Sequence, residues 1–543
     1  MVFARRSTTL LAAIIASCAM VLSLTACTSD NKTVVDGQTT VTSNSAGGVA
    51  VFTPSDGITL NQQTPLNKWA KLVPDLAKAL ADAGFKKGDI DHTTSDSLDK
   101  QSRAIQDFVV DHLSNNTTDD SGIAIAPDNM TLLVAPVVEA DASTRQYGDY
   151  VSQNLSTNDV TDGEATSDGE SSEDDSSKDD SSNTESDSTA SDEQAQAVDR
   201  LVSSLKLAKE SGMHVVLLGN SIEGYKPDAF VKFSDAQTIG KLQAEKMVSK
   251  LKLDKASKDN PKYIEVLLPY TAVDEKGNVN DSTFAQEAFR GIWQVLGSYY
   301  QKGVVESPSG TLDGKSTEND WQAVAYDAAK EGSTAKVLDK RLAKTDGQST
   351  LTRIDGIITM NDYIASEVVK ELDDLGYTGS AADINPQITI SGIVGNITGK
   401  KDLSRDAVPD PIKSPENDNA NDSSSSDDDA DEDTSASDKD RDSQWPLVTG
   451  YGAYVSNIPS IVNGKQWMTG MEDRQTIATD IAQACAKLNK DEALNSMPSI
   501  RNSEVGGVKK IPTISEPLLA VSASNLKSAL IDPGYISLAD AGL

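Results

Sequence analysis

Residues 353–379, RIDGIITMNDYIASEVVKELDDLGYTG, contain a short apolar run, a polar corner and an amphipathic pattern, in that order. The apolar run, Ile354–Thr359, is rich in β-branched residues, which predicts a buried strand. After the corner, apolar residues recur at helical spacing up to Gly376, a residue type typical of helix ends. The stretch therefore predicts one strand and one helix of a βαβ unit, with Asn361 and Asp362 at the corner between them.

The corner is a candidate binding position. In open α/β sheets, ligands bind outside the carboxyl ends of the strands, which is where Asn361 and Asp362 fall. A simpler interpretation stays open for Asp362, because short acidic side chains are also common caps of free helix N–H groups.

Strand and helix patterns alternate along the rest of the chain in two successive sets, which predicts two parallel-sheet α/β domains. The expected strands lie near residues 49–52, 131–136, 214–219, 231–233, 263–268, 354–359, 388–393 and 446–450. The expected helices lie near residues 66–84, 99–113, 201–211, 239–251, 284–300, 319–342, 362–375 and 475–488.

Two acidic runs account for most of the net charge of −34. Residues 164–193 carry a net charge of −11 and residues 416–442 a net charge of −10. Such segments cannot bury enough apolar surface to fold, so we expect disordered insertions at about 155–195 and 405–444. No basic patch stands out elsewhere, and nucleic acid is not an expected partner.

The N-terminus predicts an export signal. Arg5 and Arg6 precede an apolar core at 10–24, which is too short to span a bilayer. The core ends in Leu24-Thr25-Ala26-Cys27, which resembles a bacterial lipobox. We therefore expect residues 1–26 to be cleaved, Cys27 to be acylated, and residues 27–47 to tether the protein to the extracytoplasmic face of the cell membrane. A generic signal peptide with a chance cysteine is the alternative.

Motifs for covalent or metal catalysis are absent from the sequence. His92, His112 and His214 are scattered and lack cysteine or carboxylate neighbours at metal-ligand spacing. There is no Walker loop, G-x-S-x-G, H-E-x-x-H or G-x-G-x-x-G motif. Cys485 lies on an apolar helical face, which favours a core thiol over a nucleophile. We expect no metal site and no cofactor.

Polar residues near strand ends suit a polyhydroxyl ligand instead. Carboxylates and amides bind hydroxyl groups, arginine supplies a fork of donors, and an aromatic face covers a sugar ring. The candidate ligand-binding residues are Asp235, Arg290, Asn361 and Asp362, with Trp69 as the aromatic platform. Core packing is an equally open interpretation for Trp69.

Several stretches resemble the type I periplasmic-binding-protein family, most closely its xylose-binding subgroup of ABC-transporter sugar receptors. They are Phe233–Ala244 (FSDAQTIGKLQA), Thr359–Asp362 (TMND), Val508–Pro512 (VKKIP) and a tail that contains Leu518–Val521 (LLAV), Asn525–Ser528 (NLKS) and Asp532–Tyr535 (DPGY). The resemblance covers about residues 48–540, apart from the insertions.

The resemblance implies two Rossmann-like lobes, joined by three crossovers, that close over a sugar. It assigns residues 48–235 and 453–490 to an N-terminal lobe, 236–450 to a C-terminal lobe, and 491–543 to a tail that packs on the lobes and hinge. It also implies that Asp362 and Asn361 bind the ligand and that Arg290 lies near further contacts.

The chain departs from the family pattern at three positions. Gly219-Asn220 stands where the family has an Asp-Arg pair, and Gly450-Tyr451-Gly452 where it has Gly-x-Asp. Phe233-Ser234-Asp235 replaces a Phe-Asp-Asn corner. These changes leave the identity of the sugar open.

The sequence therefore predicts a monomeric, lipid-anchored solute-binding protein that delivers a sugar to an ABC permease and has no catalysis of its own. One alternative is a surface sensor or interaction protein with a degenerate pocket. The other is an extracellular carbohydrate-active enzyme, for which Asp235 and Asp362 are the carboxylate pair to test.

Overall fold

The opening stretch forms the predicted strand and helix. The computed structural model describes residues 46–55, 65–115, 129–138, 146–151, 153–156, 185–273, 280–343, 351–381 and 443–543. Strand β12 is Gly356–Ile358 and helix α9 is Asp362–Leu375. Asn361 is the N-cap, since its side chain accepts a hydrogen bond from the N–H of Ile364 at 2.9 Å. Gly376 ends the helix with φ +94°, a left-handed conformation that favours glycine.

A seven-stranded sheet forms the first half of the fold, in the order β15-β16-β7-β5-β3-β1-β2. All neighbours are parallel except β15 and β16. The strands are β1 Gly48–Pro54, β2 Ile90–Ser95, β3 Met130–Val134, β5 His214–Leu218, β7 Ala229–Lys232, β15 Ile500–Val505 and β16 Val508–Ser515.

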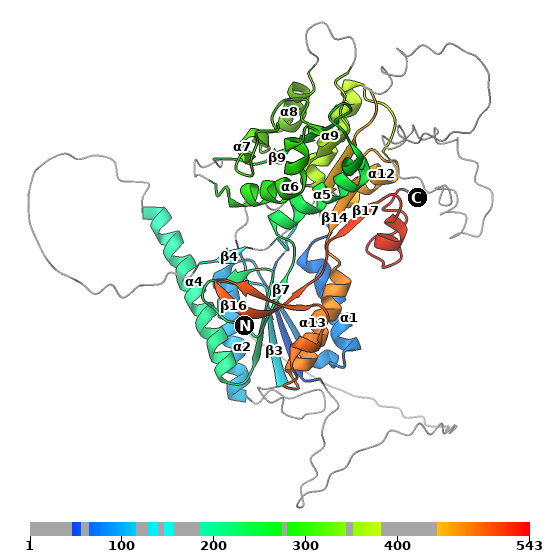
Figure 1. The fold of residues 1–543 in the computed structure, drawn as a ribbon. Coiled ribbons are helices and arrows are strands. Elements are labelled where there is room, and N and C mark those ends of the chain that lie inside the picture. The colour runs from blue at the N-terminus through cyan, green and yellow to red at the C-terminus, as the bar shows by residue number, and fades with distance from the viewer. Residues whose placement is uncertain are drawn as a thin grey trace, which may run out of the picture. The chain divides into compact units, whose positions relative to one another are not determined.

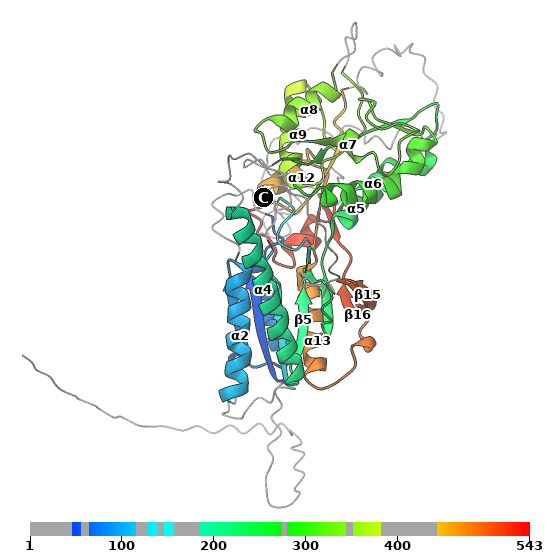
Figure 2. The ribbon, with the colours of Figure 1, turned by 90° about the vertical axis from the view of Figure 1, so that its left-hand side faces the viewer.

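Two pairs of helices cover the opposite faces of this sheet (Figure 1). Helices α1, Trp69–Asp82, and α13, Arg474–Leu488, pack on one face. Helices α2, Leu98–Asn115, and α4, Glu185–Glu210, lie side by side on the other (Figure 2). The buried apolar residues of each face form a separate core cluster.

A six-stranded sheet forms the second half, in the order β10-β8-β12-β13-β14-β17. Only β17 is antiparallel to its neighbour. The strands besides β12 are β8 Lys262–Val266, β10 Val305–Glu306, β13 Leu447–Tyr451, β14 Met468–Met471 and β17 Leu519–Ser522. The helices besides α9 are α5 Ala236–Leu251, α6 Thr283–Gln301, α7 Trp321–Val324, α8 Ser333–Arg341 and α12 Ile458–Val462. Two further strand pairs are β4 Asn154–Leu155 with β6 Ser221–Ile222, and β9 Leu268–Pro269 with β11 Ala325–Tyr326.

The two large sheets share one strand order. Counting strands along the chain, the first five strands of each sheet run 2-1-3-4-5 in both: β2-β1-β3-β5-β7 and β10-β8-β12-β13-β14. This is the order of doubly wound sheets that bind ligands at their carboxyl edge. The predicted fold class, an α/β protein with two Rossmann-like lobes, is confirmed.

The chain passes three times between the sheets. The first crossing is 233–235, between β7 and α5, and the second is 472–473, between β14 and α13. The third is 516–518, between β16 and β17. The predicted N-terminal lobe included 453–490, whereas β14 still pairs in the six-stranded sheet and the chain leaves that sheet at Glu472. The predicted tail, 491–543, supplies strands to both sheets.

Some local predictions differ from the structure. Residues 319–342 were expected to be mostly helical, but β11 separates α7 from α8. Strand β2 was not predicted, because it is an exposed edge strand whose sequence shows little alternation of apolar and polar residues. Helix α4 starts at Glu185, inside the first predicted insertion, because its later turns bury apolar residues against α2. Residues 157–184 of that insertion, the strand expected at 388–393 and residues 405–442 of the second insertion lie outside the described residues.

Candidate functional site

The first and second crossings meet in a buried polar network. The N–H of Ser234 donates to Oε1 of Glu472 at 2.6 Å, and its hydroxyl lies 2.5 Å from the Tyr451 hydroxyl. Tyr451 in turn donates to Oε1 of Glu472 at 3.3 Å. The exposed fraction of each of these side chains is 2% or less. Each residue lies at or just beyond the carboxyl end of β7, β13 or β14.

Burial controls the ionisation of this network. It raises the pKa of Glu472 to about 7, although the hydrogen bonds from Ser234 and Tyr451 oppose the rise. Burial also raises the pKa of Tyr451 well above its ordinary value, and the nearby charge of Glu472 adds to this effect. The network can therefore hold or release a proton near neutral pH.

Asn67 adds an unsatisfied donor beside Glu472. Its Oδ1 accepts a hydrogen bond from the N–H of Glu472 at 3.4 Å. Its Nδ2 has no hydrogen-bond partner among the described residues, although the side chain is only 2% exposed. A buried amide N–H without a partner costs free energy and marks a position where a ligand oxygen would be favourable.

The Asn361-Asp362 corner is equally buried. The exposed fraction of both side chains is 0%. Besides capping α9, Asn361 donates from Nδ2 to Oε1 of Gln146 at 3.1 Å. We define the crossing site as Asn67, Ser234, Asn361, Tyr451 and Glu472.

Asp362 is saturated by groups of the chain itself. Its carboxylate accepts from the N–H of Tyr454 at 2.9 Å, Nε2 of Gln466 at 2.7 Å and the hydroxyl of Thr469 at 2.8 Å. Burial raises its pKa to about 6, against the lowering effect of these hydrogen bonds. A Cβ atom at Gly450 would lie 2.2 Å from Oδ1 of Asp362, which explains why glycine occupies that position. The carboxylate therefore holds the 453–454 loop against α9.

Aromatic side chains gather around the crossing site in two groups. Trp69, Tyr150 and Phe233 form one group, with ring centroids 4.8–5.8 Å apart. Tyr147 packs against Phe284 at 4.7 Å and lies 6.4 Å from Tyr451 in the other. Trp69 is 3% exposed and belongs to the core cluster of the seven-stranded sheet. Its place fits the core interpretation, and its role as a ligand platform stays a prediction.

The remaining predicted contacts lie elsewhere. Asp235 caps α5, accepting from Thr238, and pairs with Lys232 at 2.8 Å. Burial raises the pKa of Asp235, but the hydrogen bonds from Lys232 and Thr238 outweigh it, so the pKa is lowered overall. Arg290 forms a partly exposed ion pair with Glu287 on α6. Neither shares a hydrogen bond with Asn361 or Asp362 among the described contacts, and Cys27 lies outside the described residues.

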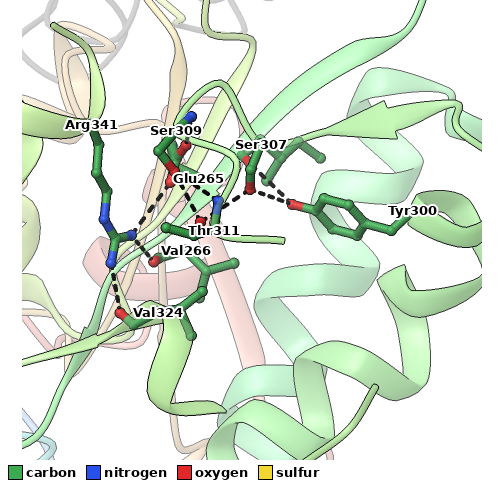
Figure 3. Close-up of polar contacts among 9 residues, drawn as sticks. Glu265, Val266, Tyr300, Ser307, Ser309, Thr311, Val324 and Arg341 are labelled. Atoms are coloured by element: carbon green, nitrogen blue, oxygen red, sulfur yellow. Dashed lines mark hydrogen bonds and ion pairs between the residues drawn. The ribbon is translucent and has the colours of Figure 1, made fainter. Parts of the chain in front are cut away.

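A second buried charge cluster lies in the six-stranded half (Figure 3). Glu265 on β8 is 0% exposed and lies 3.4 Å from Nη1 of Arg341 at the end of α8. Glu265 also accepts from the N–H of Ser309, and Arg341 donates to the carbonyl oxygens of Val266 and Val324. Burial raises the pKa of Glu265 and lowers that of Arg341, and the attraction between the two charges opposes both shifts.

The cluster continues into hydroxyl contacts beside β8. Tyr300 and Ser307 both donate to the carbonyl oxygen of Ile264, at 2.9 and 3.1 Å. The charged groups of the cluster thus all have partners within the chain. Their contacts connect three segments to β8: the residues after β10, the end of α7, and α8. This arrangement indicates a structural role rather than a ligand site.

Sequence reasoning missed Glu472, Tyr451 and Asn67. Glu472 directly follows strand β14, but the apolar signal of Met468–Met471 is too short to be read as a strand by itself. Asn67 precedes a helix and carries no pattern of its own. Within the described ranges, no group of three or more His, Cys, Asp or Glu side chains could hold a metal ion. Nor is any described helix both long and apolar enough to span a bilayer.

Comparison with known proteins finds similarity only at the level of solved structures. No protein-family model matches the chain, and a search of curated proteins finds no match. Similar structures include an ABC-transporter solute-binding protein from Clostridium phytofermentans with bound β-D-glucose. It is 18% identical with a TM-score of 0.44, over 91% of this chain and 99% of that one.

Two further structures resemble the chain to a similar extent. A carbohydrate-transporter solute-binding protein from Chloroflexus aurantiacus in complex with D-glucose is 18% identical with a TM-score of 0.43, over 91% of this chain and 98% of that one. A periplasmic ribose ABC transporter from Conexibacter woesei is 14% identical with a TM-score of 0.41, over 90% and 96%.

Proposed function

We propose that this protein is an extracytoplasmic solute-binding protein that takes up a sugar at the crossing site and delivers it to an ABC permease. The observation that carries the proposal is the course of the chain. It passes three times between two parallel sheets of the same strand order, and side chains from the first two crossings converge at the carboxyl ends of strands in both sheets. Short crossings between two lobes are the arrangement that hinge closure over a ligand requires.

The chemistry of the crossing site suits a polyhydroxyl ligand. Asn67 and Asn361 supply amide donors, Glu472 supplies an acceptor, and Tyr451 supplies a hydroxyl that can both donate and accept. Phe284 and Trp69 border the same region with apolar ring surface. A few polar groups that converge among aromatic side chains are what a small-molecule site needs for orientation and specificity.

Location and partners belong to the proposal as well. Acylation at Cys27 would hold the mature chain on the membrane through its lipid, with residues 27–47 as the tether. The ligand-loaded protein would then meet its permease at that surface as a monomer. We propose no catalytic step and no cofactor.

A binding screen tests the function. The mature chain, residues 27–543 with Cys27→Ser, would be titrated with D-glucose, D-xylose, L-arabinose, D-ribose, sucrose and raffinose by thermal shift and calorimetry. We expect at least one sugar to raise the melting temperature. Asn361→Ala should weaken its binding at least tenfold, because an amide donor is lost from a buried site.

The matched control is Asp281→Ala. Asp281 also accepts a hydrogen bond at the start of a helix, from Thr283, but it is exposed and lies outside the crossing site. Asp281→Ala should therefore destabilise its helix start by a similar amount to Asn361→Ala, without changing the affinity of the protein for the sugar. The screen would be repeated with Tyr147→Ala, the variant described below. If no sugar of the panel shifts the melting temperature of either protein, sugar transport is the wrong function.

A sensor or interaction protein with a degenerate pocket is the second candidate. One observation favours it: Asn361 and Asp362 already bind groups of the chain itself. The enzyme alternative needs two carboxylates that flank a substrate bond. With Asp362 enclosed by three donors and Asp235 engaged as a helix cap, that pair gives the enzyme no support.

A further inference from the structure

We propose that residues 146–151, Gln-Tyr-Gly-Asp-Tyr-Val, are an internal occupant of the crossing site, which an external ligand must displace in order to bind. The inference rests on the proposed function and concerns the regulation of the same site. We call residues 146–151 the occupant segment. They belong to no helix or strand of the described chain, yet Tyr147 and Tyr150 are each only 1% exposed.

One end of the occupant segment contacts the six-stranded half. Gln146 accepts from Nδ2 of Asn361 at 3.1 Å with its side chain, and from the Tyr454 hydroxyl at 2.7 Å with its carbonyl oxygen. The ring of Tyr147 packs against Phe284 at a centroid distance of 4.7 Å and approaches Tyr451 at 6.4 Å. Tyr147 belongs to the core cluster of that half.

The other end contacts the seven-stranded half. The ring of Tyr150 stacks on Phe233 at 4.8 Å and makes a T-shaped contact with Trp69 at 5.1 Å, both between ring centroids. Asp149 pairs with Lys68 at 2.8 Å and accepts the N–H of Trp69 at 3.2 Å, at the start of α1. Tyr150 belongs to the core cluster of this half. The occupant segment thus joins core clusters of both sheets.

Gly148 lets the occupant segment approach Asn67 closely. Its φ is +100°, and a Cβ atom there would lie 2.7 Å from the carbonyl oxygen and from Cβ of Asn67. The N–H of Asp149 donates to the same carbonyl oxygen at 2.8 Å. This is the residue whose Nδ2 lacks a partner, so the segment covers Asn67 without satisfying it.

The occupant segment engages the groups that a sugar would use. It engages the amide donor of Asn361 and the hydroxyl donor of Tyr454, and it contacts four aromatic rings. A ligand for these groups competes with a segment of the same chain. Its apparent Kd is then the intrinsic Kd divided by the fraction of molecules in which the segment has left the site.

The first test needs no ligand. Hydrogen exchange of the Asp149 amide would be compared with that of the Ile292 amide within α6, in the mature chain. A displaceable segment opens locally, so the Asp149 amide should exchange at least 100-fold faster than the Ile292 amide. Exchange of the two amides at one common rate would show that the segment leaves only on global unfolding, which overturns the proposal.

The second test measures affinity in Tyr147→Ala, with the sugar panel given above. Truncating Tyr147 removes its contacts with Phe284 and Tyr451, so the segment should leave more readily and the apparent Kd should fall at least tenfold. Tyr300→Ala is the matched control, because Tyr300 is also 1% exposed but lies in α6 and donates to Ile264. It should lower the stability without changing the Kd.

The outcomes separate this inference from the proposed function. If a sugar binds Tyr147→Ala and the unsubstituted chain with the same Kd, the segment does not occupy the site and the inference is wrong, while sugar binding stands. If the Asp149 amide opens locally but no sugar binds either protein, the assignment of a sugar ligand fails. In that case the hydrogen-exchange rates would still support the proposal that residues 146–151 can be displaced.

Discussion

The backbone N–H of Ser234 donates to Oε1 of Glu472 across 2.6 Å, although 238 residues separate the two in the chain. The bond ties the first crossing to the second, and it places a buried carboxyl group at the crossings between the two sheets. Because both groups are buried, the protonation state of the Glu472 carboxyl group affects the stability of the whole crossing region.

Glu472→Gln should change how stability depends on pH. Burial raises the pKa of Glu472 from 4.5 to about 7, so between these values the folded chain holds a proton that the unfolded chain has lost. This contribution to stability is present below pH 4.5 and is lost as pH rises through 7. Relative to the unsubstituted protein, Glu472→Gln should therefore gain about 2–4 kcal/mol of unfolding free energy between pH 4.5 and 8.

Urea unfolding at several pH values measures this difference. Glu504→Gln is the control, because Glu504 is exposed on β15 and the same loss of charge should leave the pH profile nearly unchanged. If the unfolding free energies of Glu472→Gln and the unsubstituted protein changed with pH in parallel, the raised pKa of Glu472 would be contradicted.

Arg341→Met should destabilise the six-stranded half strongly. It leaves Glu265 buried without its counter-charge and removes donors from the carbonyl oxygens of Val266 and Val324. Breaking a buried pair from one side costs about 3–5 kcal/mol. The double substitution Glu265→Gln with Arg341→Met should recover part of the loss, because no unpaired charge remains.

The exposed pair Arg103–Asp99 provides the control for that comparison. Arg103→Met should change the unfolding free energy by less than about 1 kcal/mol, as is usual for surface ion pairs. If Arg341→Met costs no more than Arg103→Met in denaturant unfolding, the buried cluster does not hold the segments together as described.

Gly450→Ala should disturb the Asp362 carboxylate. The added methyl group would lie 2.2 Å from Oδ1 of Asp362, so either the strand or the carboxylate has to move. Overpacking of this kind costs about 1–3 kcal/mol, measured as a loss of unfolding free energy. Gly314→Ala is the control, because its nearest neighbouring atom would lie at 3.4 Å. Equal stability of the two variants would show that the space beside Asp362 is larger than described.

Cys27→Ser should release the protein from the membrane fraction. The side chain of serine cannot form the thioether to lipid that anchors such proteins, and one or more acyl chains supply the membrane affinity. Fractionation of cells with detection of the protein measures the change, and mass spectrometry of the unsubstituted protein should find acyl groups on Cys27. An unmodified Cys27 in the mature chain would refute the anchor.

Local patterns predicted the secondary structure wherever a segment buries one regular face. Helix α9 with its end at Gly376, the strands β1, β3 and β5, and helices α1, α6 and α13 all follow from periodicity, since burial selects apolar residues at the spacing of the element. The same patterns missed β2, whose side chains are mostly exposed, and β11, which is too short to have a period.

The site depended on contacts that no local pattern encodes. The sequence could place Asn361 and Asp362 at a strand end, but not show that Asp362 is saturated by Tyr454, Gln466 and Thr469, which lie 92 to 107 residues away in the chain. Nor could it show that Gln146 contacts Asn361, 215 residues away. Periodicity reports whether a side chain is buried within its own element, whereas hydrogen-bond partners across a crossing are set only when both sheets have formed.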